Sequence, residues 1–215
     1  MRSDSPARNA LSLAVPMVVF GISFGVLSVS AGFGLAQTCA MSLLAFTGAS
    51  QFLYVSVLGA GGTVLSALAP ALLLAARNGV YATSLGSVLA PHPWRRAAEA
   101  QLVIDESTAM AHAQGGAGAK RRAFLLTGLT VLAAWNLGTL VGAAVGSDLG
   151  DPRRLGLDAI FPAVFIALLA PQLRRGGAVG AALAGAAVAL VLLPVAPVGV
   201  PVLAATLAAL PALRR

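Results

Sequence analysis

The chain has 215 residues, 58% of them hydrophobic and 10% charged, whereas about 25% of the residues of a typical soluble domain are charged. Its 14 Lys and Arg and 7 Asp and Glu residues are too few to cover the surface of a water-soluble domain. This composition excludes an ordinary soluble protein. It predicts an all-α, polytopic transmembrane helical bundle whose apolar residues face the lipid bilayer.

The net charge of +7 does not indicate binding to nucleic acid, because the basic residues form no continuous stripe. They occur in short groups at the ends of apolar segments: Arg95-Arg96, Lys120-Arg121-Arg122, Arg153-Arg154, Arg174-Arg175 and Arg214-Arg215. Such groups are typical of cytoplasmic loops and of side chains that anchor a helix end at the membrane surface. The lone Cys39 excludes a disulfide and a cysteine-based metal site, and we expect no cofactor.

A helix needs about 20 apolar residues to cross the bilayer, and several stretches meet that measure. They cover residues 10–32, 38–59, 63–90, 123–147, 157–173 and 178–195. Residues 198–213 are apolar but contain Pro201 and Pro211, so they form either another span or a tilted interfacial piece. We therefore predict a single transmembrane domain over residues 1–215 with six to eight membrane segments, some of them broken helices.

A weak internal repeat suggests two possible halves, residues 10–114 and 123–213. Gly-x-x-x-Gly occurs at Gly21 to Gly25 and again at Gly138 to Gly142, and a phenylalanine-rich segment follows each copy. Duplicated halves are usual in secondary transporters. Small-residue faces of this kind also serve helix association.

The long polar interval at residues 91–122 predicts a helix from about 97 to 114, ended by Gly115-Gly116. This helix carries Asp105 and Glu106, and it is either a solvated loop helix or a helix in or beside the membrane. The distribution of basic residues predicts that both termini are cytoplasmic. The number of crossings before Lys120 is then even, so either 97–114 crosses the membrane or one of the first three segments is re-entrant.

The second apolar segment contains Gly48-Ala49-Ser50-Gln51-Phe52 at its middle. A glycine-bearing break at this depth would expose backbone groups that can bind the charged ends of an amino acid, as broken helices do in transporters. The alternative is ordinary helix packing, in which Gln51 joins two helices by hydrogen bonds.

Arg77 and Asn78 lie near the middle of the third segment. An unpaired guanidinium there would cost at least about 2.5 kcal/mol, so Arg77 requires a carboxylate, either from Asp105 or Glu106 or from a substrate. Asp158 lies shortly before Pro162 in another apolar segment. The candidate substrate-binding residues are Gly48, Ser50, Gln51, Phe52, Arg77 and Asn78, and the candidate coupling or ion-pair residues are Asp105, Glu106 and Asp158.

Five pieces of the chain together resemble the AzlC family, the large subunits of branched-chain amino-acid exporters. They are PMVVFGISFG at 16–25, FTGASQF at 46–52, LLLAARNGVYATSL at 72–85, IDESTA at 104–109 and LGLDAIFPAVFIALLAP at 155–171. The family often has Asn-x-Arg-His in the third segment, whereas this chain has Ala75-Ala76-Arg77-Asn78 and keeps the arginine alone. This departure leaves the substrate open. The resemblance implies a small AzlD-type membrane subunit as partner.

Three functions compete at this point. The first is secondary export of branched-chain or other neutral amino acids across the cytoplasmic membrane. The second is a non-transporting scaffold for a partner subunit, and the third is an intramembrane enzyme. The chain has no HExxH, nucleophile elbow or phosphate loop, so we expect no catalytic activity. A polar cavity between the second and third segments would favour transport over a scaffold.

Overall fold

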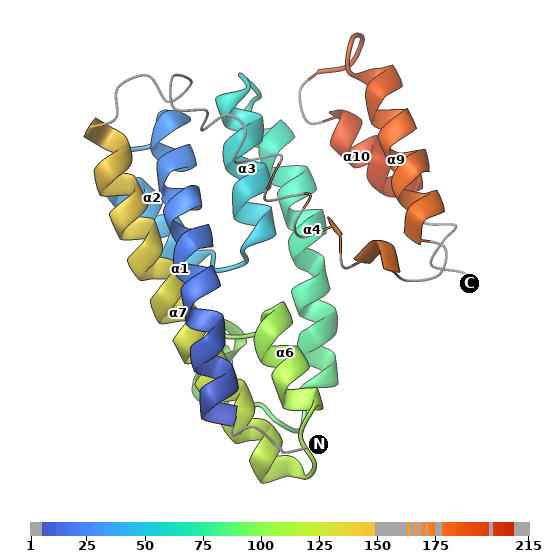
Figure 1. Cartoon of the computed structure of the whole chain (residues 1–215). Helices are drawn as coiled ribbons and strands as arrows, with labels where there is room; N and C mark the ends of the chain where they lie inside the picture. The colour runs from blue at the N-terminus through green and yellow to red at the C-terminus, as the bar shows by residue number, and fades with distance from the viewer. Residues whose placement is uncertain are drawn as a thin grey trace.

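A computed structural model of the chain describes residues 6–148, several positions between 163 and 174, and residues 178–197 and 200–208. Every regular element in this part of the chain is a helix (Figure 1). The predicted all-α membrane fold is therefore confirmed. Three helices are long and apolar enough to cross a membrane, at residues 10–30, 64–84 and 117–147.

The two longest helices form the centre of the fold. Helix α1 (Pro6–Ser30) and helix α7 (Ala117–Asp148) run in the same direction, side by side along their length (Figure 1). Glycines make this contact possible, because a Cβ added at Gly25 would lie 2.3 Å from the Thr139 carbonyl oxygen and one at Gly142 would lie 2.1 Å from the Ile22 carbonyl oxygen. Both Gly-x-x-x-Gly motifs thus meet inside this chain, which is the close backbone approach that small residues permit.

The second apolar segment is a helical hairpin that dips into the bundle and returns to the same end. Helix α2 (Leu35–Leu44) descends, residues 45–48 turn, and helix α3 (Ala49–Gly59) ascends (Figure 1). Gly48 has φ +63° at the turn, a conformation that glycine adopts without steric cost. The expected glycine-bearing break is confirmed, and this segment does not cross as a single span.

Helix α4 (Val64–Ser84) then runs the full height of the bundle and ends in turns at residues 85–90. The expected helix over 97–114 is wrong in its extent, because the structure has two short helices there, α5 (Pro93–Ala100) and α6 (Asp105–His112). Residues 101–104 separate them. The break is stabilised locally, since the Ser107 hydroxyl accepts a hydrogen bond from the Ile104 amide at 3.2 Å and donates to the Leu102 carbonyl at 2.5 Å.

The α5–α6 pair is a second hairpin that enters from the end opposite to the first. At its base, Ser84 Oγ and His112 Nε2 lie 3.1 Å apart, and Arg121 Nη1 donates to Glu99 Oε2 at 3.1 Å. Its turn reaches the first hairpin, because Gln101 Nε2 donates to the Leu43 carbonyl at 2.7 Å. Two hairpins of opposite orientation therefore meet in the middle of the bundle.

This arrangement favours the re-entrant alternative. Helix α1 crosses, the α2–α3 hairpin returns, α4 crosses back and the α5–α6 hairpin returns, so α1 and α7 begin at the same end of the bundle (Figure 1). An even number of crossings before Lys120 is thereby reached without a crossing by residues 97–114.

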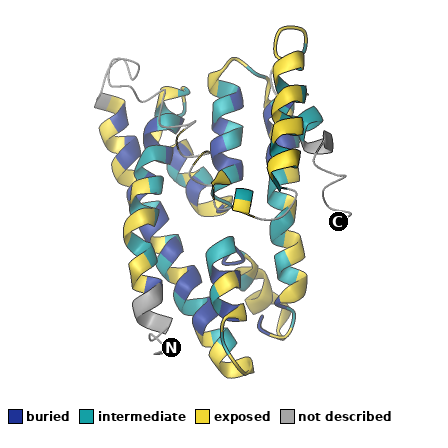
Figure 2. Cartoon of the chain, turned by 45° about the vertical axis from the view of Figure 1, so that its right-hand side comes forward, coloured by how far each residue is buried: buried dark blue, intermediate teal, exposed yellow. Residues whose placement is uncertain are grey.

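Exposed residues lie along the outer faces of the helices (Figure 2), and many of them are large and apolar. Leu65 is 76% exposed, Leu44 75% and Val15 71%, as expected for residues that face lipid. Inside, Trp135 packs with Phe24, Phe46 and Phe52, at ring centroid distances of 5.9, 6.4 and 5.9 Å respectively. This aromatic cluster joins α1, α7 and the turn of the first hairpin.

The C-terminal part contains η3 (Gln172–Arg174), α9 (Ala178–Leu192) and α10 (Val200–Ala208). Helices α9 and α10 pack on each other, with Gly185 beside Ala205. Helix α9 ends at Leu192, before the end of the expected segment 178–195, and the expected segment 198–213 extends beyond the described residues. Most of the expected segment 157–173, including Asp158, lies outside the described residues.

Candidate functional site

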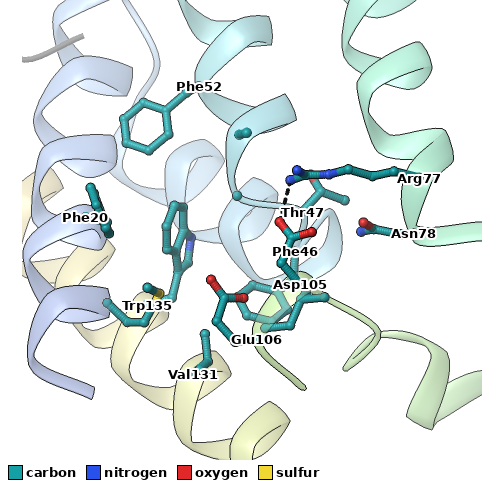
Figure 3. A pocket seen from close by; sticks show the side chains of 14 residues that line it. Phe20, Phe46, Thr47, Phe52, Arg77, Asn78, Asp105, Glu106, Val131 and Trp135 are labelled. Atoms are coloured by element: carbon teal, nitrogen blue, oxygen red, sulfur yellow. Dashed lines mark ion pairs between the residues drawn. The ribbon is translucent and has the colours of Figure 1, made fainter. Parts of the chain in front are cut away.

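Arg77 and Asp105 form an ion pair where α4 passes the turn of the second hairpin. Arg77 Nη2 lies 3.0 Å from Asp105 Oδ2, and the two side chains are 35% and 42% exposed. The structure thus gives Arg77 the carboxylate that its depth in the apolar segment requires. Asn78 faces the same space from the next position of α4 (Figure 3).

Asp105 and Glu106 occupy the first turn of α6. Unsatisfied backbone N–H groups give a helix N-terminus a partial positive charge, so carboxylates are stabilised there. Asp105 is engaged by Arg77, whereas no basic group of the described residues lies within ion-pair distance of Glu106. Glu106 instead directs its carboxylate into the cavity (Figure 3).

The turn of the first hairpin closes the site from the opposite side. Gly48 and Ala49 line the cavity at the N-terminus of α3. The N-termini of α3 and α6 therefore both lie at the centre of the bundle, where each contributes partial positive charge. This is the arrangement that discontinuous helices give to transporter sites.

A cavity connects these groups with an apolar wall. Its volume is about 60 Å³. Side chains of five helices and both hairpin turns line it: Met17, Phe20, Phe46, Thr47, Gly48, Ala49, Phe52, Arg77, Asn78, Ile104, Asp105, Glu106, Val131 and Trp135. One arginine and two carboxylates give it a formal charge of −1.

Six of the candidate residues lie together in this cavity: Gly48, Phe52, Arg77, Asn78, Asp105 and Glu106. Ser50 and Gln51 face a separate apolar cavity of about 300 Å³ between α2, α3 and α4. Gln51 also serves the backbone, because its Nε2 donates to the Met41 carbonyl at 2.9 Å and its Oε1 accepts from the Gly48 amide at 3.2 Å. The Gln51 side chain therefore holds the turn of the hairpin. This agrees with the alternative in which Gln51 joins two helices by hydrogen bonds.

Trp135 is a site residue that sequence reasoning missed. A tryptophan within an apolar segment indicates core or interfacial packing, and this one is only 4% exposed. Its Nε1–H nevertheless has no hydrogen-bond partner among the described residues, while its indole lines the cavity. Gln101, which ties the two hairpins together, was likewise missed, since its sequence context is that of a loop.

The chain is similar to several known protein sequences. The family model described as AzlC protein matches residues 12–149, which include most of α1 and the whole of α2 to α7. An uncharacterized membrane protein of Archaeoglobus fulgidus is 33% identical, over 85% of this chain and 83% of its own. An uncharacterized membrane protein of Helicobacter pylori is 28% identical, over 78% of this chain and 74% of its own. No solved structure matches. The chain belongs to the AzlC family of membrane proteins.

Proposed function

We propose that this protein is the large subunit of a secondary exporter for neutral amino acids with apolar side chains, such as valine, leucine, isoleucine and methionine. The observation that carries the proposal is the cavity in which a cation, two carboxylates and two helix N-termini meet an aromatic and aliphatic wall. A zwitterion with a hydrocarbon side chain presents the complementary groups. Charged side chains at membrane depth have a high free-energy cost, and a role in binding a charged substrate would explain their presence.

The position of the cavity supports transport. It lies where two hairpins of opposite orientation meet, so movement of one hairpin turn would open it to one face of the membrane and movement of the other turn to the opposite face. Alternating access around a central site is the usual mechanism of secondary transporters. The cavity volume of about 60 Å³ has room for a few water molecules, so an amino acid requires such a widening.

The scaffold alternative was supported mainly by the two Gly-x-x-x-Gly faces, and this support is now weaker. Gly21, Gly25, Gly138 and Gly142 approach the backbone of the neighbouring helix within this chain. They are therefore used for internal packing and do not remain available as a docking face for a partner. The enzyme alternative gains no support, since Arg77 and Asp105 are engaged with each other. The Thr47 hydroxyl, which lines the cavity, bonds the Ala45 carbonyl and the Ser50 hydroxyl and not a basic side chain.

The proposal includes an AzlD-type small membrane subunit and a cytoplasmic membrane location. Both are tested by following labelled valine, leucine, isoleucine and methionine in cells that express this chain alone or with an AzlD-type small membrane subunit. We expect faster efflux of these amino acids than in cells without the chain. Unchanged efflux of all four amino acids, with the small subunit present and both proteins in the membrane, would contradict the proposal.

A further inference from the structure

Among the described residues, the cavity contains one donor without a hydrogen-bond partner and one carboxylate without an ion-pair partner. The donor is Nε1–H of Trp135, which is buried and has no hydrogen-bond partner among the described residues. The acceptor is the carboxylate of Glu106, which no basic group of the described residues approaches to ion-pair distance. Both groups face the same cavity (Figure 3). A buried donor without a partner costs about 1–3 kcal/mol, so the indole N–H would gain from an acceptor on a ligand, and the Glu106 carboxylate would gain from a cationic group.

The remaining charged groups are already satisfied by each other. Arg77 and Asp105 pair at 3.0 Å, so a bound solute would have to break an existing ion pair to use either of them. Trp135 and the first amides of α3 require no such exchange. The 11-residue helix α3 begins at Ala49. The Gln51 and Phe52 amides donate to the Gly48 carbonyl, so the amides of Ala49 and Ser50 are those that a helix N-terminus leaves without a partner inside the helix.

We propose that Trp135 and the N-terminus of α3 bind the carboxylate of the transported amino acid, and that Glu106 binds its ammonium group. This assignment rests on the proposed function and goes beyond it by dividing the two charged ends between named groups. The indole N–H supplies a neutral donor, and the α3 amides add the positive end of a helix dipole. The amino-acid side chain then lies against the apolar wall formed by Met17, Phe20 and Val131.

The position of Trp135 is fixed well enough for selective recognition. Its ring contacts Phe24, Phe46 and Phe52 at centroid distances between 5.9 and 6.4 Å. Its backbone is also constrained, because a Cβ at Gly21 would lie 2.4 Å from the Trp135 carbonyl oxygen. A donor held in this way is preorganised, and preorganisation lowers the ordering cost of binding.

The chain offers its own optical probe for the test. It contains two tryptophans, Trp94 and Trp135, and Trp94 is 80% exposed on α5, away from the cavity. Trp94→Phe therefore leaves Trp135 as the sole tryptophan and is also a matched control for loss of an indole. In the purified Trp94→Phe protein, we expect leucine to change the emission of Trp135 saturably. Leucine binding, measured with the radiolabelled compound, that leaves this emission unchanged would overturn the assignment.

Analogues that lack one charged end separate the two roles. Leucinamide lacks the carboxylate and 4-methylpentanoate lacks the ammonium group, so the wild type should bind each about tenfold or more weakly than leucine, since one charge-assisted hydrogen bond contributes enough for that factor. Trp135→Phe should weaken leucine binding about tenfold and leave leucinamide binding unchanged. Glu106→Gln should weaken leucine binding and leave 4-methylpentanoate binding unchanged.

The outcomes distinguish the assignment from the function on which it rests. If Trp135→Phe keeps the wild-type preference for leucine over leucinamide, the carboxylate does not bind at Trp135 and the assignment fails alone. If the wild type binds none of the apolar amino acids, with or without the small subunit, the proposed function fails as well. The emission of Trp135 in the Trp94→Phe protein gives an answer even where Trp135→Phe does not fold.

Discussion

Arg77 on α4 and Asp105 on α6 are joined by an ion pair of 3.0 Å, and this pair connects a membrane-crossing helix to the turn of a re-entrant hairpin. Both residues also line the central cavity. The pair therefore connects the hairpin to α4, and because its two charges cancel, the formal charge of the cavity comes from Glu106.

Removal of one member of this pair should destabilise the protein. Loss of one partner costs about 3–5 kcal/mol for a buried pair and less than about 1 kcal/mol for an exposed one. With side chains 35% and 42% exposed, the pair should lie between these limits. We expect Arg77→Gln to lower folded abundance, measured by fluorescence-detected size exclusion.

Addition of Asp105→Asn to Arg77→Gln should restore part of that abundance, because no uncompensated charge remains. Glu106→Gln is the matched control, since no ion pair of the described residues includes Glu106, and it should leave abundance unchanged. Equal abundance of the wild type and Arg77→Gln would show that the pair has no role in folding.

Gln51→Leu should lower both stability and transport. The side chain donates to the Met41 carbonyl and accepts from the Gly48 amide. Its loss removes this link between α2 and α3 and leaves the Gly48 amide without that partner, at about 1–3 kcal/mol for a buried group, while the Met41 carbonyl keeps its bond from the Ala45 amide. We expect a lower melting temperature in detergent and a lower transport rate per folded molecule. Normal stability with lost transport would instead support direct contact between Gln51 and the substrate.

The glycine contact between α1 and α7 should tolerate no added methyl group. A Cβ at Gly142 would lie 2.1 Å from the Ile22 carbonyl oxygen, so Gly142→Ala must separate the helices. Such overpacking typically costs about 1–3 kcal/mol, and the folded yield should fall. Gly79→Ala in α4 is the control, because nothing lies within 4 Å of its added Cβ. Equal yields for the two variants would argue against the close packing.

The hairpin topology predicts on which side of the membrane each loop lies. Gly61 lies between α3 and α4 and Gly116 lies before α7, at opposite ends of the bundle. In a Cys39→Ala background, Gly61→Cys should react with a membrane-impermeant thiol reagent in intact cells, whereas Gly116→Cys should react after permeabilisation. Reaction of both in intact cells would contradict the topology. Reversed reactivity would contradict only the cytoplasmic placement of Lys120.

The features that were predicted from the sequence are those in which a single residue has a large effect on the local free energy. Arg77 required a nearby carboxylate because an unpaired guanidinium is expensive in hydrocarbon, and Gly48 indicated a break because glycine weakens a helix and permits positive φ. The break at residues 101–104 was missed although Asp105 and Glu106 mark a helix start, because the apolar residues Leu102 to Ile104 are equally compatible with a continuous helix.

Other features depend on tertiary contacts that no local pattern encodes. Trp135 became a candidate ligand only when its neighbours were known, since the sequence cannot show whether an indole N–H finds a partner. Gln51 had two interpretations from the sequence, and the positions of Met41 and Gly48 give its hydrogen bonds to the backbone. The roles of the candidate residues in substrate binding remain predictions.

Exchange of labelled leucine across proteoliposomes tests the central claim most directly. The wild-type chain, reconstituted with an AzlD-type small subunit, should exchange internal leucine for external labelled leucine, and valine, isoleucine and methionine should compete whereas lysine and glutamate should not. Glu106→Gln should reduce the rate at least about tenfold, as expected when a charge-assisted hydrogen bond to the substrate is lost, while Trp94→Phe should retain it. Absence of leucine exchange by the wild-type complex, or an equal rate for Glu106→Gln, would contradict an amino-acid site in this cavity.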